Sequence, residues 1–364
     1  MKPSVLFFCP TFTAGGVEKV LVNLANYFCK TGFSTSFLVC QRIGELEGHL
    51  NGEIKIESFN KRLSGSFWPA VKFFRAHNPD IIICGPQFIN ILAVLVIKLL
   101  LRKNSKVVLT HHSFYDLDVQ QMPFLKLFYK SFLKIFYKHS DVVVAVSNAV
   151  KSHLVNDIGL KEEKIKVIYN PVLEDNFEAL KQEEFYHKWL IPGKQFKVLV
   201  CAGRLSKVKN QEALIRLFPA LIKKNNCKLI LLGDGDQRSF LEGLVSELAL
   251  SDYVDLVGSV INPVKYIAES DLLLLPSVSE TFSLVAVESI AAGTPVLSTH
   301  TLGVKEILGN CRGCFFESIE NPEDYIQKIK QILNTEKIEV DQDFTDKFKI
   351  SAIGQLYVDL ILQK

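Results

Sequence analysis

The chain has 364 residues, a length that favours two domains over a single hydrophobic core. Its content of 48% hydrophobic and 22% charged residues is typical of a globular protein and excludes a disordered one. The formal net charge of +3 is too small for a dedicated nucleic-acid-binding protein, although it suits anionic ligands or an anionic membrane surface.

Neither the first nor the longest apolar segment of the chain favours export or membrane insertion. The first, Val5–Cys9, is too short for a signal peptide and ends at Pro10. The longest, Phe88–Leu101, contains Asn90 and Lys98 and is shorter than the roughly 20 residues of a membrane-spanning helix. We therefore expect a buried helix there and a cytoplasmic protein.

Strand-like runs alternate with helical patterns along the whole chain. Most runs are nearly continuous Val, Ile and Leu, which is typical of parallel strands covered on both faces. The expected strands are Val5–Cys9, Thr35–Cys40, Asp80–Cys84, Lys106–Thr110, Asp141–Ser147, Lys164–Tyr169, Lys197–Ala202, Lys228–Gly233, Val254–Gly258, Asp271–Pro276 and Pro295–Thr299.

A polar segment over residues 170–195, interrupted by prolines and a glycine, separates two such series. We therefore predict two doubly wound α/β domains, residues 1–172 and 190–340, that face each other across a central cleft. The final pattern, over 344–362, predicts one amphipathic helix, and residues 345–364 are candidates to pack back on the first domain.

Eight cysteines are scattered along the chain, several of them inside apolar strands, which indicates small buried side chains in a reducing compartment. Cys311 and Cys314 form a lone CxxC without a second pair or nearby histidines. A turn before a strand over 314–316 is the better interpretation than a metal or redox site.

The first of four informative loops contains Gly15 and Gly16, between the first strand and a helix. Glycines allow a ligand close to the backbone, and a helix start favours an anion. The loop lacks the GxGxxG pattern of dinucleotide-binding proteins, and a plain tight turn is an equal alternative.

The second loop, residues 203–210, follows a strand expected to be buried and contains Arg204 and Lys209. Ligands of doubly wound sheets bind at such strand ends, and Arg and Lys are the cations that hold phosphates. The alternative is a pair of solvated surface cations.

The third loop, residues 277–281, leads to a helix expected to start near Phe282. The N–H groups of Phe282, Ser283 and Leu284 would be free there to bind phosphate or sugar oxygens. Glu280 precedes the helix and Glu288 lies inside it, so both carboxylates could accept hydrogen bonds from hydroxyl groups. A capping carboxylate and a solvated helix residue are the alternative.

The fourth loop follows the strand that ends at Thr110 and contains His111 and His112, of which at most one should face the cleft. Two histidines without carboxylates do not form a metal site. We interpret the Asp-x-Asp patterns at 116–118 and 234–236 as structural turns.

Several segments together resemble the retaining glycosyltransferases of the large bacterial family 4, which have the GT-B fold. They are TAGGVEKVLVNLAN from residue 13, SDVVVAVSNAVK from 140, IYNPV from 168, GRLSKVKN from 203, GDGD from 233 and SETFSLVAVESIAAGTPVL from 279. The resemblance covers nearly the whole chain and implies transfer of a sugar from a nucleotide diphosphate sugar with retention of configuration, without a metal or other cofactor.

The resemblance also assigns roles to residues. It implies that Arg204 and Lys209 hold the diphosphate, that Glu288 binds the ribose, and that Glu280 contacts the donor sugar beside the backbone at 282–284. It places Gly15 and Gly16 near the phosphates and the acceptor. It matches His112 to the histidine of the cleft, with His111 as the second choice.

The chain departs from the family where Thr281 and Ser283 stand in place of the usual glycines, which narrows the expected sugar pocket and puts the donor sugar in doubt. The family's paired glycine is here Gly303 followed by Val304. The IYNPV segment favours, by resemblance, a UDP-linked hexose or N-acetylhexosamine.

Residues 124–138 combine lysines every four residues with Phe and Leu between them. On a helix this pattern predicts contact with an anionic membrane surface, or a core-packed helix with a solvated lysine face. The first interpretation suggests a lipid-linked or polysaccharide acceptor, in lipopolysaccharide, capsule or related glycan synthesis. The alternatives are a nucleotide-sugar epimerase and a catalytically silent nucleotide-sugar-binding subunit of a polysaccharide assembly complex.

Overall fold

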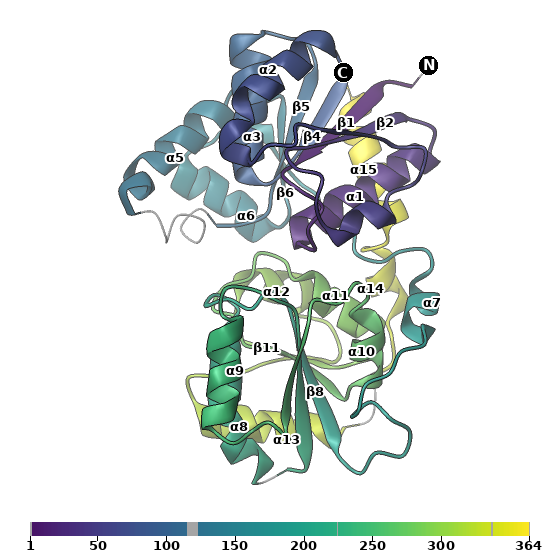
Figure 1. The fold of residues 1–364 in the computed structure, drawn as a ribbon, viewed down its shortest axis with the longest axis vertical. Coiled ribbons are helices and arrows are strands. Elements are labelled where there is room, and N and C mark those ends of the chain that lie inside the picture. Colours follow the sequence, from purple (N-terminus) through teal and green to yellow (C-terminus); the bar gives the residue numbers. More distant parts are fainter. Residues whose placement is uncertain (1, 115–122, 224, 336–337, 364) are drawn as a thin grey trace. The chain divides into compact units, whose positions relative to one another are not determined.

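The computed structural model describes residues 2–114, 123–223, 225–335 and 338–363. The chain divides into two compact units, unit 1 with residues Met1–Glu174 and Phe348–Lys364 and unit 2 with residues Asp175–Lys347. Each unit is a parallel sheet with helices packed on it (Figure 1), which confirms the predicted doubly wound α/β class.

The sheet of unit 1 has the strand order β3-β2-β1-β4-β5-β6-β7, and its strand pairs are parallel. The six strands expected from the sequence are present. The short edge strand β3 was missed because its sequence, KIES, is polar and only partly buried. The strands are β1 (Ser4–Cys9), β2 (Ser34–Val39), β3 (Lys55–Ser58), β4 (Ile81–Cys84), β5 (Lys106–His111), β6 (Val142–Ala145) and β7 (Ile165–Val167).

The helices of unit 1 bury their apolar faces against this sheet. The first helix begins directly after Gly15, and a left-handed Gly32 follows its end. The elements are α1 (Gly16–Lys30), η1 (Glu45–His49), η2 (Leu63–Gly65), α2 (Phe67–Ala76), α3 (Gln87–Ala93), η3 (Val94–Leu100), α5 (Pro123–Tyr137), α6 (Asn148–His153), η4 (Leu154–Ile158), η5 (Glu162–Lys164) and α15 (Ile350–Leu362).

The apolar stretch 88–101 forms the continuous α3–η3 helix, as predicted. Ile89, Val94 and Ile97 are fully buried in it. None of the helices in the described part of the chain has the length and hydropathy to cross a bilayer.

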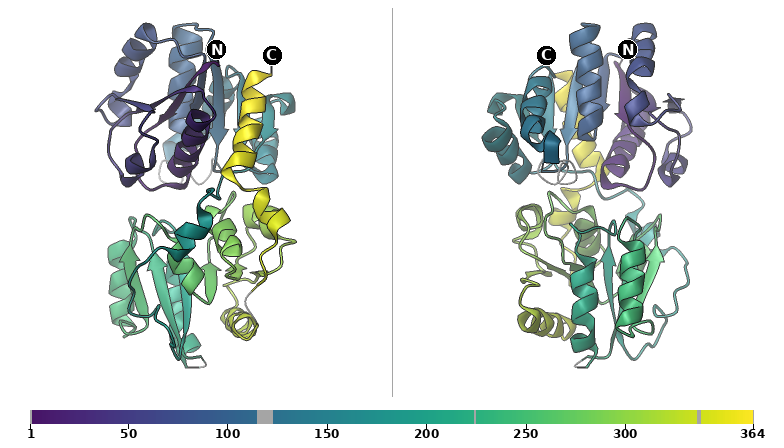
Figure 2. Two further views of the ribbon diagram at one scale, coloured as in Figure 1. Left: turned by 90° about the vertical axis from the view of Figure 1, so that its right-hand side faces the viewer. Right: turned by 60° about the vertical axis from the view of Figure 1, so that its left-hand side comes forward.

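The C-terminal segment differs from the single helix predicted over 344–362. It forms two helices, α14 (Gln342–Asp346) and α15, and the backbone leaves the helical conformation at Lys349. The cause is pairing with another segment: the Phe348 carbonyl accepts hydrogen bonds from the N–H groups of Val172 and Leu173. Helix α15 then packs beside α1 in unit 1 (Figure 2).

The sheet of unit 2 has the order β10-β9-β8-β11-β12-β13, again with parallel pairs and with the predicted strands present. One hydrophobic core of Leu, Ile and Val side chains lies between this sheet and its helices. The strands are β8 (Lys197–Ala202), β9 (Cys227–Leu232), β10 (Val254–Gly258), β11 (Leu272–Leu275), β12 (Val296–Ser298) and β13 (Cys314–Phe316). The helices are α7 (Phe177–Gln182), α8 (Gln211–Ile222), α9 (Arg238–Glu247), α10 (Val264–Glu269), α11 (Leu284–Ala291), α12 (Leu302–Leu308), α13 (Pro322–Leu333) and α14.

In each sheet the strand order reverses next to the strand that comes first in that unit's sequence. In unit 1 the reversal lies between β1 and β4, and in unit 2 it lies between β8 and β11. Crevices at the carboxyl ends of such strands are the ligand-binding positions of doubly wound sheets. The loops after β8 and β11, and those after β1, β4 and β5, are therefore the expected positions for a ligand.

Candidate functional site

In unit 2, the loops after β8 and β11 are joined directly. The Val278 N–H donates to the Val208 carbonyl at 2.8 Å, and Asn210 Nδ2 donates to the Pro276 carbonyl at 3.2 Å. The two predicted ligand-binding loops of this unit are thus held together by the fold itself, before any ligand is considered.

The strongest contact between these loops is an ion pair. Lys209 Nζ lies 2.6 Å from Glu280 Oε1, and Ser277 Oγ donates to the same oxygen at 2.8 Å. The Glu280 side chain is only 7% exposed and that of Lys209 is 28% exposed, so the charges are largely shielded from water. The structure therefore brings together two residues that are 71 positions apart in the sequence.

Arg204 lies in the same loop but differs from Lys209 in its surroundings. Its side chain is exposed, and among the described residues no carboxylate lies within ion-pair distance of it. Its carbonyl oxygen accepts a hydrogen bond from Gln211 Nε2 at 3.0 Å. The guanidinium is thus available to an anionic ligand, while the backbone beside it is fixed.

The backbone of the GDGD segment packs directly against the backbone of the loop that contains Arg204. A Cβ atom on Gly233 would lie 2.1 Å from the Gly203 carbonyl oxygen, and one on Gly235 would lie 2.2 Å from that of Leu205. Leu205 N–H also donates to the Asp234 carbonyl at 3.0 Å. These glycines allow two backbone segments to touch, which fits the structural interpretation of the 234–236 pattern. The pattern at 116–118 lies outside the described residues.

Helix α11 starts at Leu284, two residues later than expected, and Ser283 is its N-cap without a side-chain capping bond. Ser283 has a φ of +78°, a conformation that glycine adopts readily and other residues adopt at a cost of about 1–3 kcal/mol. This explains why a glycine is usual at this position. Phe282 is buried, whereas Thr281 and Leu284 are partly exposed.

Close packing against α12 holds this helix start. The Gly303 N–H donates to the Glu280 carbonyl at 2.9 Å, and a Cβ on Gly303 would lie 2.2 Å from the Thr281 carbonyl carbon. Glu288, one turn into α11, is 2% exposed. The two glutamates are thus both buried carboxylates of one loop–helix segment, rather than solvated surface residues.

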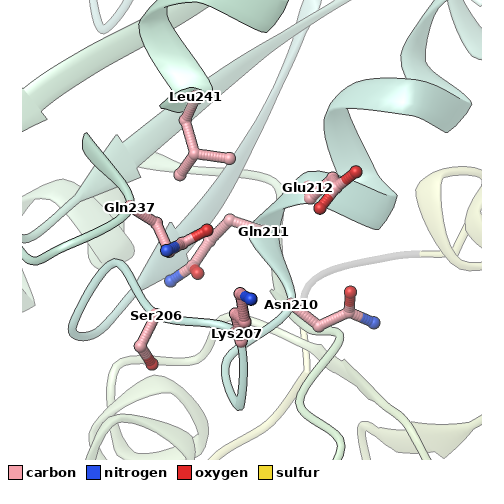
Figure 3. A pocket seen from close by; sticks show the side chains of 7 residues that line it. All are labelled: Ser206, Lys207, Asn210, Gln211, Glu212, Gln237 and Leu241. Atoms are coloured by element: carbon pink, nitrogen blue, oxygen red, sulfur yellow. The ribbon is translucent and has the colours of Figure 1, made fainter. Parts of the chain in front are cut away.

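A cavity of about 220 Å³ lies next to the Arg204 loop in unit 2 (Figure 3). Its lining differs from the predicted site residues. It consists of Ser206, Lys207, Asn210, Gln211, Glu212, Gln237 and Leu241.

In unit 1, the two adjacent histidines at the end of β5 have different surroundings. His111 is fully buried, while the His112 residue as a whole is partly exposed. His111 Nδ1 lies 3.1 Å from the Tyr137 hydroxyl oxygen, and its Nε2 lies 3.2 Å from Gln87 Nε2. His111 is therefore enclosed by these partners, and the Nε2 atom of His112 is also shielded from solvent.

The hydrogen bonds also define the state of His111. Gln87 Oε1 accepts from the Tyr129 hydroxyl, so its amide nitrogen faces His111 and donates to Nε2. The proton of the neutral ring is therefore on Nδ1 and is donated to Tyr137. Burial lowers the pKa of His111 to about 3, with the neighbouring His153 and His112 adding to the effect, and burial lowers the pKa of His112 to about 3.

At the start of α1, Gly15 is the N-cap and Gly16 is the first helical residue. A Cβ on Gly15 would lie 2.2 Å from Glu18 Oε2, so glycine is needed there to accommodate the Glu18 carboxylate. The Glu18 side chain, which carries no motif in the sequence, places a negative charge at the helix start.

Other contributions were also missed by the sequence analysis. Ser277 and the Gln87–Tyr129–Tyr137 group carry no motif, because their roles depend on long-range contacts. Among the residues that the structure describes, no group of three or more His, Cys, Asp and Glu side chains could hold a metal ion.

Two protein-family models match this chain. The model "Glycosyltransferase Family 4" matches residues 14–175, and the model "Glycosyl transferases group 1" matches residues 181–349. Together they cover both units and the predicted site loops.

Curated relatives agree with these matches. An uncharacterised glycosyltransferase of Methanocaldococcus jannaschii is 32% identical over 53% of this chain and 50% of its own length. The Campylobacter jejuni N-acetylgalactosamine-N,N'-diacetylbacillosaminyl-diphospho-undecaprenol 4-alpha-N-acetylgalactosaminyltransferase is 30% identical over 56% of this chain and 53% of its own length. The chain thus matches about half the length of these two relatives.

Among solved structures, Anabaena HepE in complex with UDP and glucose superimposes with a TM-score of 0.77. It is 20% identical and covers 100% of both chains. This likeness extends the agreement in fold to the whole chain.

Proposed function

Because this chain belongs to the family 4 glycosyltransferases with the GT-B fold, we propose that it transfers a hexose or N-acetylhexosamine from a nucleotide diphosphate sugar. The donor is a UDP-sugar, the configuration is retained, and the acceptor is a lipid-linked glycan or polysaccharide. The ion pair of Lys209 and Glu280, next to the accessible Arg204 at the β8/β11 reversal, is the observation that carries this proposal.

The main electrostatic task of this reaction is to stabilise the departing diphosphate. Arg204 can bind two phosphate oxygens, and Lys209 adds a compact positive charge. Cations placed in this way can stabilise developing charge without a metal ion, and we propose that the protein needs none. Glu280 accepts hydrogen bonds from hydroxyls of the donor sugar, and Glu288 accepts them from the ribose.

Retention of configuration follows from attack on the same face as the leaving group. The acceptor hydroxyl oxygen forms the new bond to the anomeric carbon as the bond to the β-phosphate oxygen breaks. The hydroxyl proton passes to the departing diphosphate, so no residue of the chain is bonded to the sugar. His112, neutral because its pKa is lowered to about 3, would donate or accept a hydrogen bond rather than supply a charge.

The proposal that the acceptor is lipid-linked depends on the surface of helix α5. Among its described side chains, Tyr129, Leu133 and Tyr137 are buried, which agrees with a core-packed face. Phe132 and Ile135 are 51% and 47% exposed. Lys130 and Lys134 of the same helix are exposed, as is Lys138 directly after it.

Exposed apolar rings beside cations are the features of a helix that lies on an anionic membrane. We therefore propose that α5 holds the enzyme at the cytoplasmic face of the membrane, where a lipid-linked acceptor is available. The Campylobacter jejuni relative, whose name specifies a diphospho-undecaprenol acceptor, supports this choice.

Flotation with liposomes tests the membrane part. A variant with Phe132→Ser and Ile135→Ser should lose binding to anionic vesicles, while Leu356→Ser, an exposed apolar residue of α15, should not. Equal flotation of the unmodified protein with neutral and anionic vesicles would contradict the proposal.

Release of nucleotide from UDP-, GDP- and ADP-sugars, with membrane extract as acceptor source and chelator present, tests the catalytic part. We expect release from one donor, and its loss in Arg204→Ala. Lys207→Ala removes a nearby exposed cation and should retain the activity. An Arg204→Ala protein that is folded and fully active would contradict the assigned role.

A further inference from the structure

The Lys209 ammonium has two possible anionic partners. In this structure it is bound to Glu280, 2.6 Å away, and the Ser277 hydroxyl fixes the same carboxylate oxygen. In the proposed reaction, the same ammonium binds the diphosphate. The carboxylate and the phosphate therefore compete for one cation in a partly shielded location.

Either outcome of this competition has an energetic cost. If Lys209 turns to the diphosphate, Glu280 keeps the Ser277 hydroxyl as a donor but loses the positive charge that pairs with it, which is unfavourable for a buried carboxylate. If Lys209 bridges both groups, the carboxylate and the phosphates remain close and repel each other. A nucleoside diphosphate therefore binds more weakly than it would if Glu280 were uncharged.

The sugar nucleotide can compensate for the loss of the Lys209–Glu280 ion pair, whereas the nucleoside diphosphate product cannot. A sugar nucleotide brings hydroxyl groups that can donate to Glu280 when Lys209 moves to the phosphates. A free nucleoside diphosphate has no group for that position. The two ligands differ by the sugar alone, so Glu280 acts on their relative affinities.

We propose that Glu280 makes the site discriminate between the sugar nucleotide and the nucleoside diphosphate product by taking back Lys209 whenever no sugar hydroxyls are present. This inference rests on the proposed function. It adds a second role to Glu280, because the carboxylate then weakens binding of the product and promotes its release after transfer.

Arg204 provides the contrast that makes this role measurable. It is exposed and has no carboxylate partner among the described residues, so it binds the diphosphate of donor and product alike. Arg204→Ala should weaken the binding of the sugar nucleotide and of the nucleoside diphosphate by similar factors. Glu280→Gln should instead change the ratio of their affinities, since it removes the competing charge and keeps the shape of the side chain.

Isothermal titration calorimetry with UDP, and with the UDP-sugar that gives turnover, tests the proposal in the full chain. Glu280→Gln should bind UDP about tenfold more tightly than the unmodified protein and bind the UDP-sugar less tightly. The matched control is Glu212→Gln, which removes one negative charge near the same loop but from a carboxylate bonded to Arg216 at 2.7 Å. It should change the UDP affinity by less than about twofold.

Glu280→Asp distinguishes the effect of the charge from the effect of side-chain length, because aspartate is one methylene group shorter. It retains the carboxylate, so UDP binding should stay weak even though turnover falls. If Glu280→Gln binds UDP no more tightly than an active unmodified protein, the inference is wrong and the proposed function stands. If the unmodified protein does not bind UDP, GDP or ADP and does not release any of these nucleotides from the corresponding nucleotide sugars, both the inference and the proposed function are wrong.

Discussion

At the end of β5 in unit 1, His111 is enclosed by uncharged hydrogen-bonding groups, whereas at the ends of β8 and β11 in unit 2, Lys209 and Glu280 form an ion pair. Both locations are shielded from water. Shielding makes an isolated charge unfavourable, and a protein can respond by neutralising the group or by pairing it. In unit 1 the buried group, His111, is neutral, and in unit 2 the charged groups, Lys209 and Glu280, are paired.

The comparison gives each unit a different expected sensitivity. The unit 2 loops should respond to loss of charge and to movement of the backbone that holds the charges. The end of β5 should respond to pH and to the loss of a single hydroxyl group.

Replacing Lys209 with Met should lower the rate of sugar transfer by about 10²–10³-fold, because one cation that stabilises the departing diphosphate is lost. It also leaves Glu280, 7% exposed, without its partner, so the melting temperature should fall. Steady-state transfer assays and thermal unfolding would measure both effects.

Lys207→Met is the control, since this lysine is exposed in the same loop. A Lys209→Met protein that transfers sugar at the normal rate would show that the charged pair in unit 2 has no role in the reaction.

Replacing Gly233 with Ala should destabilise unit 2 by about 3 kcal/mol without changing any charge. Gly233 has a φ of +131°, and the added Cβ would meet the Gly203 carbonyl oxygen at 2.1 Å. Displacement of the Arg204 loop should reduce nucleotide affinity as well.

Chemical unfolding and UDP binding would measure this effect. The control is Gly243→Ala in α9, where a Cβ would have open space and the helix should become up to about 1 kcal/mol more stable. Normal UDP binding and stability in Gly233→Ala would mean that the loop tolerates movement and that charge alone matters in unit 2.

Much of this comparison could be predicted from the sequence, for reasons that are local. Continuous apolar runs predicted the parallel strands, and the strand ends then located Arg204, Lys209 and Glu280, because strand direction determines which loops share an edge. The shared edge also predicts that the loops after β8 and β11 are neighbours. The sequence did not predict that Lys209 is bound to Glu280, since that depends on side-chain reach across the two loops.

The same limit applies in unit 1. The adjacent histidines were recognised, but the choice between them was open because both follow the same strand. The hydrogen bonds that enclose His111 come from Gln87 and Tyr137, which lie on helices α3 and α5, and the apolar patterns of these helices show only that they are buried. The break at Lys349 was missed for a similar reason, because its cause is a backbone contact with residues 172–173.

Lowering the pH should destabilise unit 1 through His111. Its pKa is about 3 in the folded protein and about 6.5 in an unfolded chain, so between these values the unfolded state binds more protons. Stability is therefore fully present above about pH 6.5 and falls toward pH 3, by about 2 kcal/mol between pH 7 and pH 5 for one such histidine.

Urea unfolding at both pH values would measure this change, and His111→Asn should reduce the pH dependence even though the variant is less stable overall. An unchanged pH dependence in the variant would show that His111 is not the neutral buried group described for unit 1.

Replacing Tyr137 with Phe should cost about 1–2 kcal/mol, the smallest of these effects. The change removes the oxygen that accepts the Nδ1 proton of His111 and that also accepts from Asn90 Nδ2 at 2.9 Å. The control is Tyr325→Phe in unit 2, whose hydroxyl is buried without a hydrogen-bond partner among the described residues. That change should be neutral or stabilising, because no bond is lost when the hydroxyl is removed.

Equal losses of unfolding free energy in the two variants would contradict the view that hydrogen bonding, rather than packing of the ring, positions His111. A larger loss in Tyr137→Phe should be accompanied by lower kcat with little change in KM for the donor, since His112 directly follows His111, the last residue of β5, and its position depends on the same strand end. Loss of stability with unchanged kcat would instead restrict the Tyr137 network to a structural role, leaving unit 2 as the source of the catalytic groups.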